Sequence, residues 1–473
     1  SFGEKLEHKA TKKNIKLDVT VDYAKSIWNN RPDFPYSKAF VSDNGETVRE
    51  KLIRLREKIN EKEAEGHIIT SLDDICWLFN IRGNDVVYNP VIMSYAYVTD
   101  KCAYLFADKD RFSDEIIEKL QKDGVTLKPY EEFYDFLDTI EEKVILVDMK
   151  RINYCAYKKI CNCGVETVKT LSPVTSMKAV KNPVEIKNLS DVHIEDGLAL
   201  TRFMFWVKEN AGKGITEKDA ADYLDNERAK ISDFIELSFE TISAYGANAA
   251  MMHYSATETD KKNIEPEGLY LVDSGGQYVG GTTDVTRTIA LGPVTDTMKK
   301  HFSKTACGML RLADTRFLYG CTGKNVDIMA REPLWECYID YKCGTGHGIG
   351  YILNVHEGPQ NIRWRFNPGV KEAVLEEGMI VSDEPGVYIE GSHGIRIENI
   401  LEVVKEEKNG DGQFMAFRHL TYVPVDLDVI DTQYMEPSDV RKLNAYHAEV
   451  YKRLSPYFEG EELEMLKKAT RAV

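Results

Sequence analysis

LYLVDSGG, residues 269–276, and TTDVTRTI, residues 282–289, are the two stretches of sequence that decide the fold. Asp273 ends an apolar run and precedes a turn, and Asp284 lies on the next β-rich run, eleven residues further along the chain. Four glycines lie between the two aspartates. This spacing predicts two neighbouring antiparallel strands whose carboxylates face one cavity.

Three later segments each add one side chain that is a good metal ligand. GTGHGIG (344–350) offers His347 among glycines, MIVSDEPG (379–386) places Glu384 at the end of an apolar strand, and GIRIENI (394–400) places Glu398 in an alternating strand. Four carboxylates and one imidazole drawn together would repel unless cations lay among them. The pattern therefore predicts a pair of divalent metal ions, and such pairs activate a shared water.

Each of these side chains alone has a simpler explanation. Asp273 would cap a turn, Glu384 would be a solvated strand end, and Arg396 would form a salt bridge with Glu398 on the same strand face. Their joint occurrence within residues 273–398 favours the metal site. Other catalytic signatures are missing, because the chain has no phosphate-loop Lys-Ser/Thr, no second aspartic-protease triplet, no H-E-x-x-H and no G-x-S-x-G.

Length and composition set the broad class. A chain of 473 residues is too long for one ordinary core, so two or more domains are expected. The net charge of −16 argues against nucleic acid binding, which needs a basic surface. The sequence has no apolar run long enough to span a membrane, and no signal peptide is apparent. Nine scattered cysteines without a CxxC repeat indicate reduced thiols and a cytoplasmic protein.

The pattern of hydrophobic residues divides the chain into four segments. A helix is expected near residues 48–59, with strands at 67–70, 91–98, 103–107 and 144–148 and helices near 112–122 and 150–160, which together indicate a compact α/β domain. Asn182-Pro183 predicts the start of a long helix through about Lys208. Residues 237–403 are expected to be short strands and glycine turns, and the tail returns to helical periodicity. The expected segments are a linker at 1–44, the α/β domain at 45–170, a catalytic domain at 171–418 and a helical extension at 419–473.

At these residues the chain resembles the creatinase/aminopeptidase or pita-bread superfamily, and within it the cytosolic Xaa-Pro aminopeptidase branch. The strings VDSGGQY, TTDVTRT, GTGHGIG, NVHEGP, SDEPG and GIRIENI occur in the family's order and spacing. The resemblance implies an α+β fold, in which a creatinase-like α/β domain precedes a C-terminal pita-bread catalytic domain. It also implies that most of a first domain precedes this part in the relatives, so that residues 1–44 are the remnant of a truncated domain.

The resemblance also assigns roles to particular residues. It implies that two metal ions, usually manganese with cobalt or zinc as alternatives, are bound by Asp273, Asp284, His347, Glu384 and Glu398. Asp284 and Glu398 would bridge the ions together with a hydroxide, and Glu384 would accept the proton of the attacking water. The remaining catalytic residues it implies are His253 and His356, which would contact the peptide, and Arg396, which would orient the ligands with Thr286.

Two further expectations concern residues outside the ligand set. Cys343 stands where many members of the family carry another histidine, four residues before His347. His393 is expected to be an exposed loop residue, whereas the histidines at 193, 301 and 447 are expected to be ordinary helix residues.

The function implied is hydrolysis of the bond between an N-terminal residue and a following proline, by a homodimer that binds neither nucleic acid nor membranes. Proline locks φ and has no amide hydrogen, so its peptides need a dedicated pocket. Two alternatives remain open at this point. One is a prolidase that acts on Xaa-Pro dipeptides, and the other is a non-catalytic pita-bread module that binds peptides.

Overall fold

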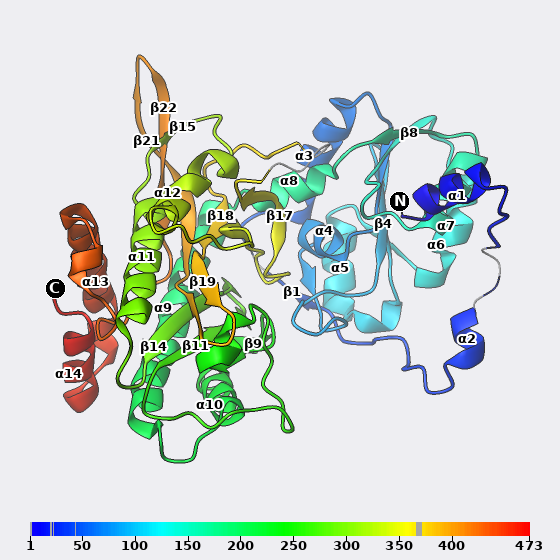
Figure 1. Ribbon diagram of the computed structural model, residues 1–473. Helices are drawn as coiled ribbons and strands as arrows, with labels where there is room; N and C mark the ends of the chain where they lie inside the picture. The colour runs from blue at the N-terminus through cyan, green and yellow to red at the C-terminus, as the bar shows by residue number, and fades with distance from the viewer. Residues whose placement is uncertain (1, 19–20, 22, 43, 366–370) are drawn as a thin grey trace. The chain divides into compact units, whose positions relative to one another are not determined.

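A computed structural model of the chain describes residues 2–18, 21, 23–42, 44–365 and 371–473. Its contacts divide the chain into two compact units, Ser1–Lys178 and Ala179–Val473. Both units mix helices and sheets (Figure 1). The four-segment division with boundaries after residues 44, 170 and 418 stays a prediction.

The first unit is built around one mixed six-stranded sheet in the order β6-β5-β4-β2-β7-β8. β2 pairs with β7, β7 with β8 and β5 with β6 in parallel, whereas β4 runs antiparallel to both β2 and β5. The α/β character predicted for this part is confirmed. The strands are β2 (Gly66–Ile69), β4 (Tyr95–Thr99), β5 (Ala103–Phe106), β6 (Thr126–Lys128), β7 (Val144–Val147) and β8 (Glu166–Lys169).

The helices of the first unit bury their apolar faces. In α3 (Val48–Asn60), the predicted face is buried, and Thr47 caps the helix through a reciprocal pair of hydrogen bonds with Glu50. The prediction of a strand at 91–98 is correct only from Tyr95, because the backbone N–H of Met93 donates to the Asp85 carboxylate (2.7 Å) and not to a neighbouring strand. The other helices are α4 (Leu72–Leu78), α5 (Asp114–Lys122), α6 (Phe133–Phe136), α7 (Tyr154–Asn162) and α8 (Pro173–Ala179).

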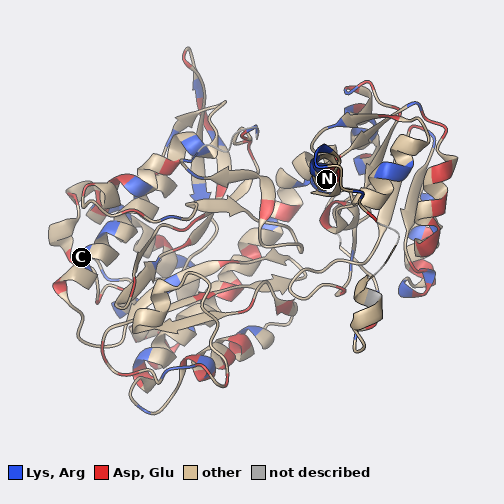
Figure 2. Cartoon of the chain, turned by 45° about the vertical axis from the view of Figure 1, so that its right-hand side comes forward, with Lys and Arg blue, Asp and Glu red and all other residues tan. Residues whose placement is uncertain are grey.

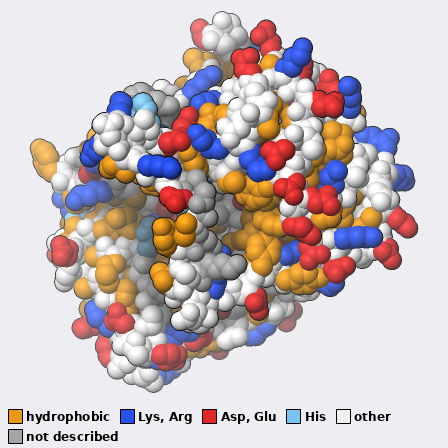
Figure 3. All heavy atoms as spheres, turned by 90° about the vertical axis from the view of Figure 1, so that its right-hand side faces the viewer, with side chains coloured by type: hydrophobic (Ala, Val, Ile, Leu, Met, Phe, Trp, Pro, Cys, Tyr) orange, Lys and Arg blue, Asp and Glu red, His pale blue; other side chains and the backbone are white. Residues whose placement is uncertain are grey.

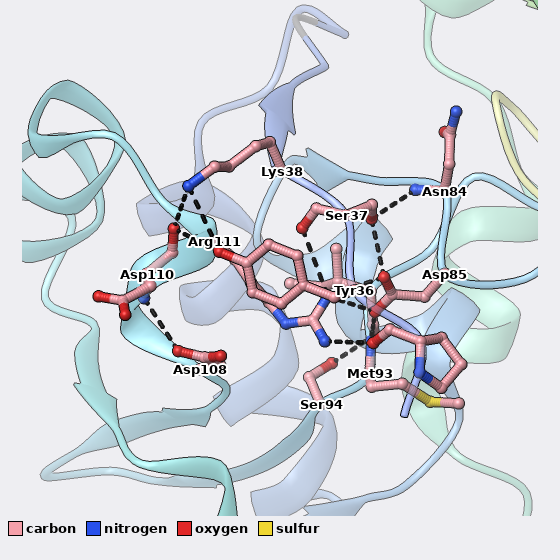
Figure 4. Close-up of polar contacts among 12 residues, drawn as sticks. Tyr36, Ser37, Lys38, Asn84, Asp85, Met93, Ser94, Asp108, Asp110 and Arg111 are labelled. Carbon is pink, nitrogen blue, oxygen red and sulfur yellow. Dashed lines mark hydrogen bonds and ion pairs between the residues drawn. The ribbon is translucent and has the colours of Figure 1, made fainter. Parts of the chain in front are cut away.

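The N-terminal residues also pack on the first unit. β1 (Phe40–Val41) pairs with β3 (Ile81–Arg82), and the chain before it contains α1 (Phe2–Lys12) and α2 (Tyr23–Ile27). Figure 4 shows how the preceding stretch is held: the buried Arg111 guanidinium donates to both oxygens of Asp85 (2.7 Å) and to the carbonyl of Pro35 (2.6 Å). Ser37 donates to the same aspartate at 2.8 Å. This ion pair therefore fixes the path of residues 35–39.

The second unit contains several sheets. β10 (Ile242–Tyr245), β11 (Leu269–Ser274) and β14 (Val285–Ala290) form one three-stranded sheet, and β9 (Phe234–Leu237), β12 (Gly276–Tyr278) and β13 (Gly281–Thr282) form another. The six-stranded sheet, in spatial order, contains β15 (Phe317–Leu318), β22 (Gly412–His419), β21 (Asn399–Asn409), β18 (Ile380–Asp383), β16 (Gly346–Gly348) and β17 (Glu357–Ile362). The hairpin of β19 (Gly386–Ile389) and β20 (His393–Arg396) completes the set.

Helices pack against these sheets, as Figure 1 shows for α9 and α11. α9 (Pro183–Asn210) begins at the predicted Asn182-Pro183 cap. The expectation that 237–403 holds only short strands and turns is wrong, because α11 (Asp296–Ala313) and α12 (Gly323–Trp335) lie within it. Phe302, Ala306 and Leu310 recur every four residues and are buried in the core, and this spacing is the sequence signal of a helix. The remaining helices are α10 (Glu217–Ala229), α13 (Pro437–Leu454) and α14 (Gly460–Ala469).

Charged residues are spread over the surface. Acidic and basic residues lie on the helices and outer loops of each unit (Figure 2), and on the face drawn in Figure 3 side chains of both signs are interspersed. In the described part of the chain, every helix is too short or too polar to cross a membrane.

Candidate active site

The two predicted aspartates come from paired strands. β11 and β14 run antiparallel with Asp273 opposite Thr286 and Ser274 opposite Val285, and Asp284 immediately precedes β14. On its other side, β11 pairs with β10, which places Ile242 opposite Asp273. Asp273 and Asp284 are both buried. The antiparallel pair predicted from their spacing is therefore present.

The other three side chains come from the six-stranded sheet and its margins. His347 lies in the middle of β16, Glu384 follows the last residue of β18, and Glu398 directly precedes β21. The strands approach closely at the glycines of 344–350: a Cβ on Gly346 would lie 1.9 Å from the carbonyl oxygen of Ser382. Glycine is required there because any side chain would separate β16 from β18.

All five residues line one cavity of about 280 Å³. The Nε2 atom of His347 lies 3.5 Å from Oδ2 of Asp284 and 3.5 Å from Oε1 of Glu384. Ligand atoms of Asp284, His347 and Glu398 all lie within 4.8 Å of one another. The structure thus brings together four acidic groups and one imidazole from five separate segments.

Burial makes the negative charge of this cluster costly. Burial and the neighbouring Glu398 raise the pKa of Asp284 well above its usual range, and burial with Glu384 does the same to the pKa of Glu398. Burial raises the pKa of Glu384 to about 7. One buried oxygen of Asp273, Oδ1, has no hydrogen-bond partner among the described residues. Hard, oxygen-preferring divalent cations fit this donor set, because they would compensate the charges and coordinate the free oxygen.

The His347 ring also has the protonation state that a metal ligand needs. Burial lowers the pKa of His347, so its ring is neutral near pH 7. Its Nδ1 lies 2.9 Å from the carbonyl oxygen of Gly348, which is the geometry of an N–H donating to a carbonyl. With the proton on Nδ1, the lone pair of Nε2 faces the carboxylates, as a metal ligand requires.

A second set of side chains holds the acidic groups in place. Arg396 forms an ion pair with Asp273, and its Nε donates to the hydroxyl of Thr286 at 3.1 Å. The hydroxyl of Thr286 in turn donates to Oε2 of Glu398 at 2.7 Å. The simpler explanation of an Arg396–Glu398 salt bridge is therefore wrong, because the threonine lies between the two.

Two residues of this set were not found from the sequence. The hydroxyl of Tyr388 accepts from Nη1 of Arg396 at 2.9 Å. Ser382 donates to Glu384 at 3.2 Å and accepts from the backbone N–H of His347 at 3.0 Å. Strand alternation would have identified Ser382, because it lies two residues before Glu384 and so on the same face.

The remaining predicted residues also line the cavity. His253 and His356 are both part of its wall, and the His356 ring lies 4.3 Å from the His347 ring, edge to face. Burial, and then His347, lower the pKa of His356 to about 4, which leaves it neutral. Cys343 also lines the cavity, and burial raises the pKa of its thiol to about 11.

The expectation for His393 is wrong. Its side chain is 2 % exposed, because it lies on β20 opposite Ile389 and His301 of α11 covers it. Its Nε2 lies 2.9 Å from Nδ1 of His301. The histidines at 193, 301 and 447 lie in helices, as expected.

Comparisons with known proteins agree with this geometry. Three family models match in succession: the creatinase/prolidase N-terminal domain at 30–185, metallopeptidase family M24 at 187–405 and the C-terminal region of peptidase M24 at 413–473. The chain is 37 % identical to the probable Xaa-Pro aminopeptidase P of Sclerotinia sclerotiorum, over 93 % of this chain and 76 % of the relative. The corresponding protein of Talaromyces stipitatus is also 37 % identical, over 99 % of this chain and 74 % of its own.

Solved structures show the same likeness. The X-prolyl aminopeptidase of Caenorhabditis elegans, described as a cytosolic enzyme with a di-nuclear active site, superposes with a TM-score of 0.92 and 30 % identity, over 100 % of this chain and 79 % of its own. The Xaa-Pro dipeptidase of Bacillus anthracis gives a TM-score of 0.64 and 25 % identity, over 80 % of this chain and 99 % of its own.

Proposed function

The chain belongs to metallopeptidase family M24, and from this premise we propose that it is a metal-dependent Xaa-Pro aminopeptidase, which releases the N-terminal residue of peptides with proline in the second position. The observation that carries the proposal is the convergence of Asp273, Asp284, His347, Glu384 and Glu398 on one cavity. The named relatives, similar over almost the whole chain, support the choice of substrate.

We propose that these five side chains hold two divalent cations. A mixed set of carboxylates and one imidazole suits manganese, and it also suits cobalt and zinc. When bound, a pair of such ions would polarise the scissile carbonyl group and activate a water molecule for attack. Asp284, His347 and Glu398, whose ligand atoms all lie within 4.8 Å of one another, would be among the residues that hold these ions.

The protein side chains divide the remaining work. Glu384 accepts the proton of the attacking water, because its carboxylate lies in the cavity with Oε1 3.5 Å from Nε2 of His347. His253 and His356 donate hydrogen bonds to the peptide and stabilise the negative charge that develops on its carbonyl oxygen. Arg396 and Thr286 keep Asp273 and Glu398 in place through their hydrogen bonds.

The proposal is tested by release of free amino acid from an Xaa-Pro-Xaa peptide. Chelator treatment should abolish the release and manganese should restore it. Glu384→Gln should lower kcat by about 10²–10⁴-fold, the usual contribution of a general base. The matched control is Glu377→Gln, whose carboxylate is 52 % exposed and pairs with Lys405. Unchanged turnover in Glu384→Gln would refute the role of this base.

Peptide length separates the proposal from its alternatives. A prolidase would cleave only Xaa-Pro dipeptides, so cleavage of tripeptides and longer peptides supports the aminopeptidase. A non-catalytic module would bind the peptides and leave them intact with every metal tested.

We also propose that the protein is a cytoplasmic homodimer. All nine cysteines are free thiols, which suits a reducing compartment. The rings of Trp335 and Trp364 meet edge to face at 5.9 Å, both side chains are about 40 % exposed, and Tyr338 is fully exposed. Exposed aromatic residues that lie together are typical of interfaces. Sedimentation velocity would test the dimer, and a monomer at micromolar concentration would refute it.

A further inference from the structure

One wall of the active-site cavity is a segment with little regular structure. Residues 246–262, here called the His253 segment, begin with the short 3₁₀ helix η4 (Gly246–Ala250) and continue without a further helix or strand. Met252, His253, Tyr254 and Ser255 of this segment line the cavity. After the 3₁₀ helix, hydrogen bonds of regular helices or strands do not hold the segment, so other contacts must fix the position of His253.

A buried carboxylate supplies these contacts. Glu217, the first residue of α10, has no solvent exposure. It accepts hydrogen bonds from the backbone N–H of Tyr245 (2.6 Å) and of Lys262 (2.8 Å), which lie immediately before and at the end of the His253 segment. Its other donors are the amide of Asn248 (3.0 Å) and the hydroxyl of Tyr254 (2.8 Å), both within the segment.

The arrangement is chemically unusual. Among the described residues, no lysine or arginine forms an ion pair with Glu217, so four neutral donors alone compensate its charge. Burying a carboxylate without a cation is costly unless its oxygens are fully hydrogen-bonded. The helix N-terminus adds favourable partial positive charge. Because these donors come from both ends and from the middle of one segment, displacing the segment would leave the buried carboxylate without its compensation.

We propose that Glu217 is a positioning residue for catalysis: it clamps the His253 segment so that His253 meets the peptide. This inference rests on the proposed function, because it assigns Glu217 a part in the same reaction. Tyr254, whose hydroxyl donates to Glu217, follows His253 directly in the chain, so the hydrogen bond acts next to the histidine. If Glu217 had only a structural role, its substitution would lower stability alone. If it positions His253, its substitution should also lower kcat, and that loss should depend on the presence of His253.

The first test uses Glu217→Gln. The amide –NH₂ of glutamine would face N–H donors, so the segment should loosen although the side-chain volume is unchanged. Hydrogen exchange of the metal-loaded protein without substrate should then quicken in residues 246–262 and stay unchanged in β11 and β14. Asp222→Asn is the matched control, because it lies on the same helix with its carboxylate 49 % exposed. Unchanged exchange in the segment would overturn the proposal.

The second test is a double-mutant cycle with His253→Ala. Glu217→Gln should lower kcat by about 10- to 100-fold, since small displacements of catalytic groups have effects of this size. The same change in the His253→Ala background should cost less than about threefold, because residues that act through one another are not additive. Metal content should match the wild type throughout. Equal losses in both backgrounds would show that Glu217 does not act through His253.

A milder variant guards against misfolding. Tyr254→Phe removes one donor to Glu217 and leaves the other three, so it should quicken exchange in the segment by a smaller factor. A wild-type protein that leaves Xaa-Pro-Xaa peptides intact would refute the proposed function. The exchange experiment needs no substrate, so it decides whether the clamp exists in either case.

Discussion

In the metal-free protein, Glu384→Gln should be stabilising, and increasingly so as the pH rises. Burial raises the pKa of Glu384 from 4.5 to about 7 in the folded protein. Between these two values the folded protein therefore binds more protons at this group than the unfolded chain does. The free energy of unfolding then falls as the pH rises, because the folded state binds more protons at this group than the unfolded chain does. Glutamine carries no charge and escapes this penalty.

The size of the effect follows from the pKa of this group. Between pH 4.5 and 7, each pH unit lowers the contribution of this group to the free energy of unfolding by about 1.4 kcal/mol. The penalty is about 1 kcal/mol at pH 5 and reaches about 3 kcal/mol at pH 8, where the group is ionised in both states. The variant should gain about 2 kcal/mol on the wild type between these pH values. Histidines with lowered pKa, such as His356, add a pH dependence common to both proteins. The negative charge of Glu384 also helps to raise the pKa of Glu398 and of Asp284, so its removal eases their ionisation and adds to the gain of the variant in the same direction.

The assay is thermal unfolding of both proteins after removal of metal with a chelator, at pH 5, 6, 7 and 8. The midpoint of the variant should rise above that of the wild type by about 3–4 °C more at pH 8 than at pH 5. Glu377→Gln should show no such trend, because its carboxylate is exposed. A difference between Glu384→Gln and wild type that stays constant with pH, or moves in favour of the wild type, would refute the reasoning.

Three further outcomes are expected. Saturating manganese should raise the unfolding midpoint of the wild type, since ligands that bind only the folded state stabilise it, and the rise should be larger at pH 8 than at pH 6 because protons compete for the carboxylates. Arg111→Met should lower the free energy of unfolding by about 3–5 kcal/mol, because it leaves the buried carboxylate of Asp85 without its ion-pair partner. Arg54→Met, at an exposed ion pair, should lower it by less than about 1 kcal/mol. Denaturant unfolding of the first unit measures both changes. Gly394→Ala should destabilise the protein by about 1–3 kcal/mol, because its Cβ would lie 1.7 Å from a backbone carbonyl oxygen, while Gly410→Ala, with open space around it, should be nearly neutral in the same unfolding assay.

Much of the fold was predictable because local signals were strong. The capping sequence at Asn182 and the spacing of apolar residues after Val48 gave helices where the structure has them. α11 was predictable from the four-residue spacing of its buried residues, but it lies between glycine-rich strands that made the whole region look like strands and turns. The start of β4 at Tyr95 was not predictable, because the backbone N–H of Met93 donates to the Asp85 carboxylate, which lies outside the strand.

The sequence by itself determined the chemical inventory of this protein: which segments end in a carboxylate, that a single imidazole lies among glycines, and in what order they occur. These are local properties, set by residue type and by the alternation of strands. Only the tertiary structure decided which side chains share a cavity and which atoms support them. Thr286 between Arg396 and Glu398, the buried position of His393 and the donors around Glu217 all join segments distant in sequence. Their positions depend on how strands and helices pack, and no pattern along a single chain records that.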